Sequence, residues 1–183
     1  MNKKDEKINQ EFIKVAKEFF PEWDRNGWTA VSKVNNDENL LQGYCDTPSK
    51  TIEIFEWWKM DGCTDWVTDK PVPFEYYADY LDSVLIHEMC HAILFTKGKG
   101  LLAHGLHNYH WFELMGIALE HAKSIGRVKL TELIERNIKK YKAGGSKACE
   151  LHEWSIDDLN HAAYGIHSRK AGEKVGYLKF ERR

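Results

Sequence analysis

The chain has 183 residues, of which 43% are hydrophobic and 30% are charged, and this is the composition of an ordinary globular domain. A chain of this length can bury a core that does not depend on disulfides. The four cysteines are scattered and form no CxxC pair, which argues against a disulfide framework or a zinc ribbon and favours a reducing compartment. No apolar run approaches the roughly 20 residues of a membrane helix, and the first residues do not resemble a signal peptide. We therefore expect a cytoplasmic protein without a membrane partner.

The formal net charge is only −2, but the charges are unevenly distributed. Residues 37–88 contain twelve acidic and three basic residues, whereas residues 121–183 contain fourteen basic and eight acidic residues. Two differently charged solvated faces would explain this asymmetry. The alternative is a basic surface for a polyanion beside an acidic cleft wall.

The first half of the chain predicts one helix followed by short strands. Residues 5–20 carry apolar side chains at helical spacing and are followed by Pro21, which predicts an amphipathic helix that ends there. β-forming residues dominate 28–34 and 40–57, and turn-forming residues lie between these two segments at 35–37. Residues 59–75 contain glycine and proline breakers and predict a loop.

The second half of the chain predicts helices. A long helical pattern covers residues 75–96, a loop runs to about residue 108, and Asn108 is a suitable N-cap for a helix through Ala122. A further amphipathic helix is expected over about residues 129–142, and Gly144 and Gly145 then mark a joint. The sequence therefore predicts an α+β domain over residues 1–143, with a small antiparallel β-sheet or hairpin. A C-terminal extension over residues 144–183 would follow, with a short helix starting near Ser155 and a basic tail.

A metal-binding motif lies inside the long predicted helix. His87 and His91 belong to an HExxH sequence, and side chains four residues apart lie on one face of a helix, so both imidazoles can reach one ion. Glu88 then lies beside the remaining coordination position, where it can take a proton from an activated water. Neutral imidazole is a good ligand for zinc, and Zn²⁺ is therefore the predicted cofactor.

A catalytic zinc needs a third protein ligand, and three histidines follow the motif. His104, His107 and His110 all lie in the loop or in the first turn of the next helix. A metzincin site is excluded, because the positions that it would fill with Gly and His are Leu94 and Lys97. A di-iron bundle is excluded as well, since no second ExxH motif is present.

The motif and the segment after it resemble the SprT-like metallopeptidases, the family to which the Spartan DNA–protein crosslink proteases belong. His87-Glu88-Met89-Cys90-His91-Ala92 is followed by a loop and by His107, with Trp111 and Met115 four and eight residues later. The family pattern is HExxHA, a variable loop and then His-Gly-x-x-[Phe/Trp]-x-x-x-Met, and Asn108 stands in place of its Gly. The resemblance covers roughly residues 8–125. It implies a zincin-like helical core, His107 as the third ligand, and a role in repair of DNA–protein crosslinks.

These observations predict a zinc metallopeptidase in which His87, His91 and His107 bind Zn²⁺ and Glu88 is the general base that activates water against a peptide bond. The expected partners are a protein substrate and DNA, the latter suggested by the resemblance and by the basic tail from Arg169 to Arg183. Two alternatives remain: a non-catalytic module that binds nucleic acid or protein around a structural zinc, and a hydrolase acting on a non-peptide amide.

The sequence also offers candidates for the side chain that stabilises the oxyanion. These candidates are Tyr109, Tyr164, His167 and Arg169. His121, His152 and His161 are interpreted as ordinary surface or core histidines and Cys90 as a core residue. Trp57, Trp58 and Trp66 are interpreted as packing residues, with base stacking as the alternative.

Overall fold

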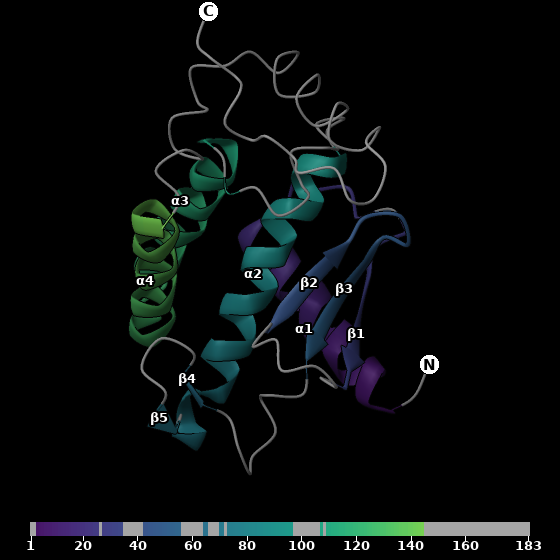
Figure 1. Ribbon diagram of the computed structural model, residues 1–183, viewed down its shortest axis with the longest axis horizontal. Coiled ribbons are helices and arrows are strands. Elements are labelled where there is room, and N and C mark those ends of the chain that lie inside the picture. Colours follow the sequence, from purple (N-terminus) through teal and green to yellow (C-terminus); the bar gives the residue numbers. More distant parts are fainter. Residues whose placement is uncertain are drawn as a thin grey trace, which may run out of the picture.

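The computed structural model describes residues 3–25, 27–34, 42–55, 64–65, 70–71, 73–96, 107 and 109–144. The elements in these residues are α1 (Lys3–Phe19), β1 (Thr29–Lys33), β2 (Gly43–Asp46), β3 (Thr51–Phe55), β4 (Thr64–Asp65), β5 (Lys70–Pro71), the 3-10 helix η2 (Phe74–Tyr76), α2 (Tyr77–Thr96), α3 (Tyr109–Ser124) and α4 (Val128–Gly144). Figure 1 shows α2 in the middle, between the sheet of β1–β3 and the helices α3 and α4. The mixed content of helix and sheet confirms the α+β class. Nearly all of the expected C-terminal extension lies outside the described residues.

The helices follow the sequence pattern closely. The buried face of α1 consists of the apolar residues at helical spacing, among them Ile8, Phe12 and Phe19, and the helix ends just before Pro21. The helices α2 and α4 begin and end within about two residues of the predicted bounds. None of the helices in the described part of the chain is both long enough and apolar enough to span a membrane.

The three-stranded sheet is mixed, so the prediction of an antiparallel sheet is wrong for one of its strands. The strand order is β1-β3-β2, with β2 antiparallel to β3 and β1 parallel to β3. The tight turn between Asp46 and Thr51 forces β3 to run back beside β2. Since β3 lies between β2 and β1, and β1 runs opposite to β2, β1 pairs with β3 in parallel. The predicted loop 59–75 contains the short antiparallel ladder of β4 and β5, and most of its other residues are outside the description.

Side chains of α1 bind the outer edge of β1. Asn9 accepts a hydrogen bond from the backbone N–H of Ala30 at 3.0 Å, and Asp5 accepts one from Ser32 at 2.9 Å. These two N–H groups point away from β3, so the acidic and amide side chains of α1 satisfy donors that an edge strand would otherwise expose. The sheet is therefore closed on the β1 side, and β2 forms its other edge among the described strands.

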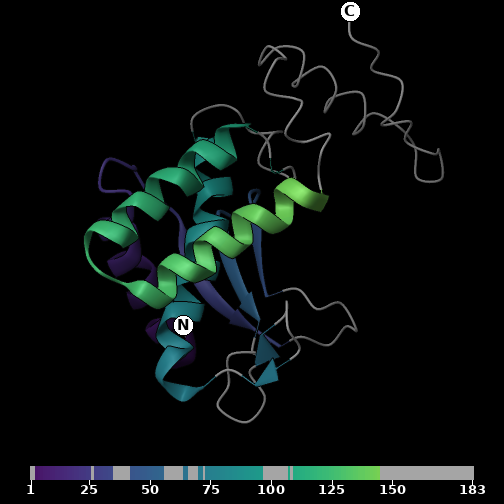
Figure 2. The same cartoon turned by 90° about the vertical axis from the view of Figure 1, so that its left-hand side faces the viewer.

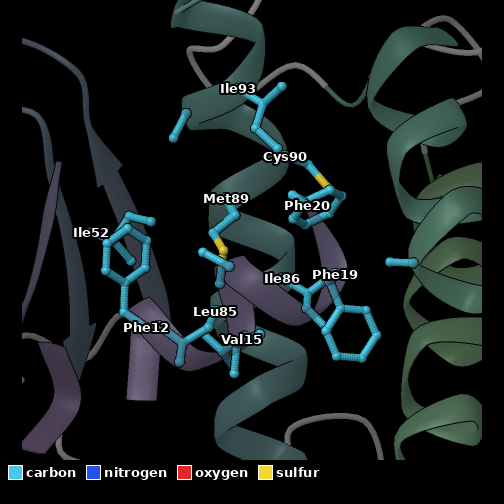
Figure 3. Packing of buried hydrophobic residues seen from close by; sticks show 14 of the residues in the cluster. Phe12, Val15, Phe19, Phe20, Ile52, Leu85, Ile86, Met89, Cys90 and Ile93 are labelled. Atoms are coloured by element: carbon cyan, nitrogen blue, oxygen red, sulfur yellow. The ribbon is translucent and has the colours of Figure 1, made fainter. Parts of the chain in front are cut away.

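The main core lies where α1, the sheet and α2 meet, and buried residues of α3 and α4, such as Met115 and Ile134, belong to it as well. Alternate residues of the strands, including Ala30, Ile52 and Ile54, are fully buried, as expected for a sheet with one covered face. In Figure 3, Phe12 of α1 and Ile52 of β3 lie on one side of α2, and Met89 is one of the side chains that α2 contributes to this core. The burial of α2 continues around the whole helix from Val84 to Leu94.

A glycine and an arginine fix the position of α4. Gly126 has φ of 70°, and the N–H groups of Gly126 and Arg127 bond to the carbonyls of Lys123 and Ala122, which is the Schellman ending of α3. The side chain of Arg127 then forms ion pairs with Asp79 and Asp82 of α2. Figure 2 shows the result, with α3 and α4 side by side in front of α2.

Candidate metal centre

The HExxH motif lies in the most buried part of α2. His87, Glu88 and His91 are all buried, and Glu88 is only 7% exposed. The side of α2 that carries Leu85 and Met89 belongs to the main core. The ionisable side chains of the motif therefore need partners from outside this core, because buried polar groups without partners are costly.

Three histidines meet beside α2. The ligand atoms of His87, His91 and His107 all lie within 4.8 Å of one another, and Nε2 of His87 is 3.1 Å from Nε2 of His107. The ring centroids of the three pairs are 4.9 to 5.2 Å apart. The i, i+4 spacing on α2 places the rings of His87 and His91 on one face of the helix. The third ring belongs to His107, which lies two residues before the start of α3. The structure thus brings together the three histidines that the sequence singled out.

Two of the three imidazoles are held in the form that binds metal. Burial lowers the pKa of His87, and the neighbouring His91 and His107 lower it further. Burial and the positive charge of Lys140 lower the pKa of His107 to about 4. Both rings are therefore neutral at physiological pH, and neutral imidazole is the species that coordinates zinc without first losing a proton.

Glu88 stands next to the three histidines without belonging to their ligand group. Its Oε1 lies 4.0 Å from Nε2 of His87. Burial raises the pKa of the carboxyl to about 8. A carboxyl that exchanges a proton near neutral pH suits a general base, and a divalent cation among the imidazoles would favour its ionised form.

Two aromatic side chains enclose the histidines. Trp111 of α3 is fully buried, and its indole N–H donates to the backbone carbonyl of His87 at 3.4 Å. Tyr141 of α4 stacks on His107 with the ring centroids 3.7 Å apart and the planes at 26°. The same ring lies 5.3 Å from His87. These contacts restrict the orientation of two imidazoles, as a metal site requires.

The donor set fits zinc. Three nitrogen ligands with a neighbouring carboxylate are the composition of a catalytic zinc site, whereas structural sites have four protein ligands. Within the described residues the ligand group has no fourth member, and the buried thiols Cys45 and Cys90 do not belong to it. A further indication is the buried Oδ1 of Asn137, which has no well-formed hydrogen bond among the described residues although its side chain lies next to His87.

The other predicted candidates do not join this group where the structure describes them. His110 pairs with Glu113 at 2.9 Å, and His121 packs edge-to-face on Phe19. Cys90 is a core residue, as the sequence predicted. The remaining candidates lie outside the description, as does the side chain of Tyr109; they are His104, His152, His161, Tyr164, His167, Arg169, Trp57, Trp58 and Trp66.

Sequence reasoning missed the contribution of α4. Asn137 and Tyr141 lie one turn apart and contact His87 and His107 respectively. Their i, i+4 spacing on a helix after the motif was the available signal, but that spacing is common in any amphipathic helix. Searches against protein-family models, curated proteins and solved structures found no match to this chain.

Proposed function

We propose that this protein is a zinc-dependent peptidase of the SprT-like kind, with a zincin-like core in which His87, His91 and His107 hold the metal. The observation that carries this proposal is the meeting of three imidazoles beside the buried carboxyl of Glu88. Two of the ligand atoms come from α2, and the third comes from His107, two residues before α3. The helices of the fold therefore hold the three ligand atoms in place.

Each side chain then has a defined task. Zinc, when bound, supplies a Lewis acid that acidifies a water and polarises a carbonyl. Glu88 accepts a proton from the attacking water and later donates it to the leaving amine. Tyr141 is the proposed side-chain donor for the developing oxyanion. Burial raises the pKa of its phenol, and the charge of Glu88 raises it further, so the phenol lies within reach of the field of the proposed base. The phenol is therefore protonated at neutral pH and can donate.

The position of β2 supports a peptide as the substrate. Among the described strands β2 lies at an edge of the sheet, and its Gly43 lies directly against Glu88: a Cβ at this position would be 2.9 Å from Cγ and 3.0 Å from Oε1 of Glu88. An extended peptide can pair with the free edge of a strand, and this edge passes next to the proposed base. A peptide bond held there would lie close to the catalytic residues.

The same site supports the alternatives less well. A structural zinc would need a fourth ligand, for which the sequence offers His104 and His110, and His110 pairs with Glu113 instead. The hydrolysis of a non-peptide amide would use the same residues, but it gives no role to the edge of β2. We therefore place peptide hydrolysis first.

DNA is proposed as a second partner. The basic tail that motivated this expectation lies outside the described residues, but the last part of α4 contributes Arg136, Lys139, Lys140 and Lys142 with no acidic residue between them. Phosphate contacts release counterions, so DNA binding by these residues would weaken steeply with salt. A titration with single-stranded and duplex DNA at low salt tests this, and no binding to either would contradict it.

The decisive experiment compares two glutamate substitutions. We expect about one zinc per wild-type chain and hydrolysis of casein or of the chain itself. Glu88→Gln is expected to keep the zinc and to lose about 10² to 10⁴ in rate, since only proton transfer is removed. Glu113→Gln is the matched control and should change neither quantity.

The outcomes separate the proposals. Unchanged hydrolysis by Glu88→Gln would contradict the assignment of the base. A wild-type protein that carries zinc and hydrolyses no peptide, with or without single-stranded DNA, would favour the non-catalytic module.

A further inference from the structure

Asn137 is a buried polar side chain whose amide oxygen bonds to no other element in the described part of the fold. It lies in the middle of α4 and is only 8% exposed, and its Oδ1 has no well-formed hydrogen bond among the described residues. A buried amide without partners costs free energy, whereas a leucine at the same place would contribute to the core. The residue therefore has a role that the packing of α4 does not explain.

The face of α4 that carries Asn137 is turned towards the three histidines. Tyr141, one helical turn further on, stacks on His107 and also lies 5.3 Å from His87. Burial lowers the pKa of His87, and the side chain of Asn137, which lies next to this ring, acts in the opposite direction. The buried Oδ1 is the atom of this amide that has no well-formed hydrogen bond among the described residues, so it is the acceptor that remains available to the imidazole.

The two nitrogens of His87 have different surroundings. Nε2 lies 3.1 Å from Nε2 of His107 and 4.0 Å from Oε1 of Glu88, so this nitrogen faces the ligand group. When Nε2 coordinates a metal, a neutral imidazole carries its proton on Nδ1. That N–H is buried with the ring and needs an acceptor, and metal-binding histidines regularly donate to one in the outer shell.

We propose that Asn137 is a positioning residue for the metal centre, whose Oδ1 accepts the Nδ1–H of His87 and so fixes the tautomer and the orientation of this ligand. The inference rests on the proposed metal site but not on peptidase activity.

The test uses three substitutions in α4 and two measurements. Asn137→Leu keeps the branched shape of the side chain and removes the acceptor, while Asn137→Asp keeps an acceptor at the same place. Leu133→Val is the matched packing control, because Leu133 is buried one turn earlier on the same helix. Zinc affinity is measured by competition with a chelator, and the stability of the metal-free protein by urea unfolding.

We expect Asn137→Leu to weaken zinc binding about 10- to 100-fold, as loss of an outer-shell partner does. The metal-free Asn137→Leu protein should be at least as stable as the wild type, because no well-formed hydrogen bond is lost. Asn137→Asp should bind zinc at least as tightly as the wild type, since a carboxylate is the usual partner of a metal-binding histidine. Leu133→Val should lower the stability and leave the affinity of the folded protein unchanged.

Three results would overturn the inference. Zinc binding by Asn137→Leu at wild-type affinity would show that the acceptor is not needed. An equal loss of affinity in Asn137→Asp, or a loss in Leu133→Val that matches Asn137→Leu, would make Asn137 a packing residue. Absence of zinc binding in the wild type would remove the metal site and this inference with it, whereas zinc binding without hydrolysis would remove only the peptidase proposal.

Discussion

Gly43→Ala tests the close contact between β2 and the proposed base. A Cβ at Gly43 would lie 2.7 Å from Cγ1 of Val84, 2.9 Å from Cγ of Glu88 and 3.0 Å from its Oε1. Distances below 3.0 Å require the strand or the helix to move. Overpacking of this kind costs about 1 to 3 kcal/mol, and the lower backbone entropy of the unfolded alanine chain offsets about 0.5 to 1 kcal/mol of it.

The net expectation for Gly43→Ala is a loss of up to about 2.5 kcal/mol in the free energy of unfolding. For a chain of this size, each kcal/mol changes the Tm by about 2 to 4 °C, so the Tm should fall by up to about 10 °C. The chain offers a matched control in Gly116 of α3, where a Cβ would meet nothing within 4 Å. Gly116→Ala should raise the stability by about 0.5 to 1 kcal/mol.

The assay is thermal and urea unfolding of the metal-free proteins, followed by zinc binding and hydrolysis. Val84→Ala removes the nearest of the three contacts, so it should recover part of the stability of Gly43→Ala, with a coupling of about 0.5 to 3 kcal/mol in a double-mutant cycle. Gly43→Ala should also lower hydrolysis, because its Cβ would press on the side chain of Glu88, and Val84→Ala should not restore it, because these contacts remain. Equal stability of Gly43→Ala and Gly116→Ala would refute the close packing of β2 on α2.

Three further predictions concern the metal centre. His107→Ala should lose zinc while His110→Ala keeps it, because only His107 lies in the ligand group. Metal analysis of the two proteins checks this, and zinc loss in His110→Ala alone would contradict it. Burial raises the pKa of Glu88 from 4.5 to about 8, so the folded metal-free protein binds a proton more tightly than the unfolded chain and its stability falls as the pH rises through this interval. Glu88→Gln should remove this pH dependence of the free energy of unfolding and be more stable than the wild type by on the order of 3 to 5 kcal/mol above pH 8, but not at pH 4. Urea unfolding at several pH values checks this, and a free energy of unfolding that changes equally with pH in both proteins would contradict it. Tyr141→Phe keeps the ring that stacks on His107, so it should retain zinc while kcat falls about 10²-fold or more, and an unchanged kcat would exclude the phenol as the oxyanion donor.

The local patterns of the sequence were sufficient for the helices. The apolar spacing of α1 and the proline after it define one buried face and one end, and both depend only on neighbours in the chain. The direction of β1 could not be predicted in the same way. An alternating pattern shows which residues of a strand face the core, but it does not show which strand lies next to it, and β3 intervenes between β1 and β2.

The same distinction applies to the metal centre. The two histidines of α2 are a local pattern, and the register of Trp111 indicated His107 as the third member of the group. Asn137 and Tyr141 could not be identified, because nothing in α4 itself distinguishes the face that meets the histidines. That face is chosen by tertiary contacts, through the turn at Gly126 and the ion pairs of Arg127 with α2.

The burial of α2 on all sides explains how one helix can serve both the fold and the site. Its apolar residues, among them Leu85 and Met89, complete a core with α1 and the sheet that does not involve the histidines. The three histidines lie on the side of α2 that faces α3 and α4, where Trp111 and Tyr141 enclose them. Because the rings of His87 and His107 are neutral in this environment, the fold can keep them buried without first supplying counter-charges. Burial also disfavours the charged form of Glu88, and a cation among the imidazoles would make that form favourable. A residue that is poorly suited to the metal-free core is thus the one that the proposed chemistry needs.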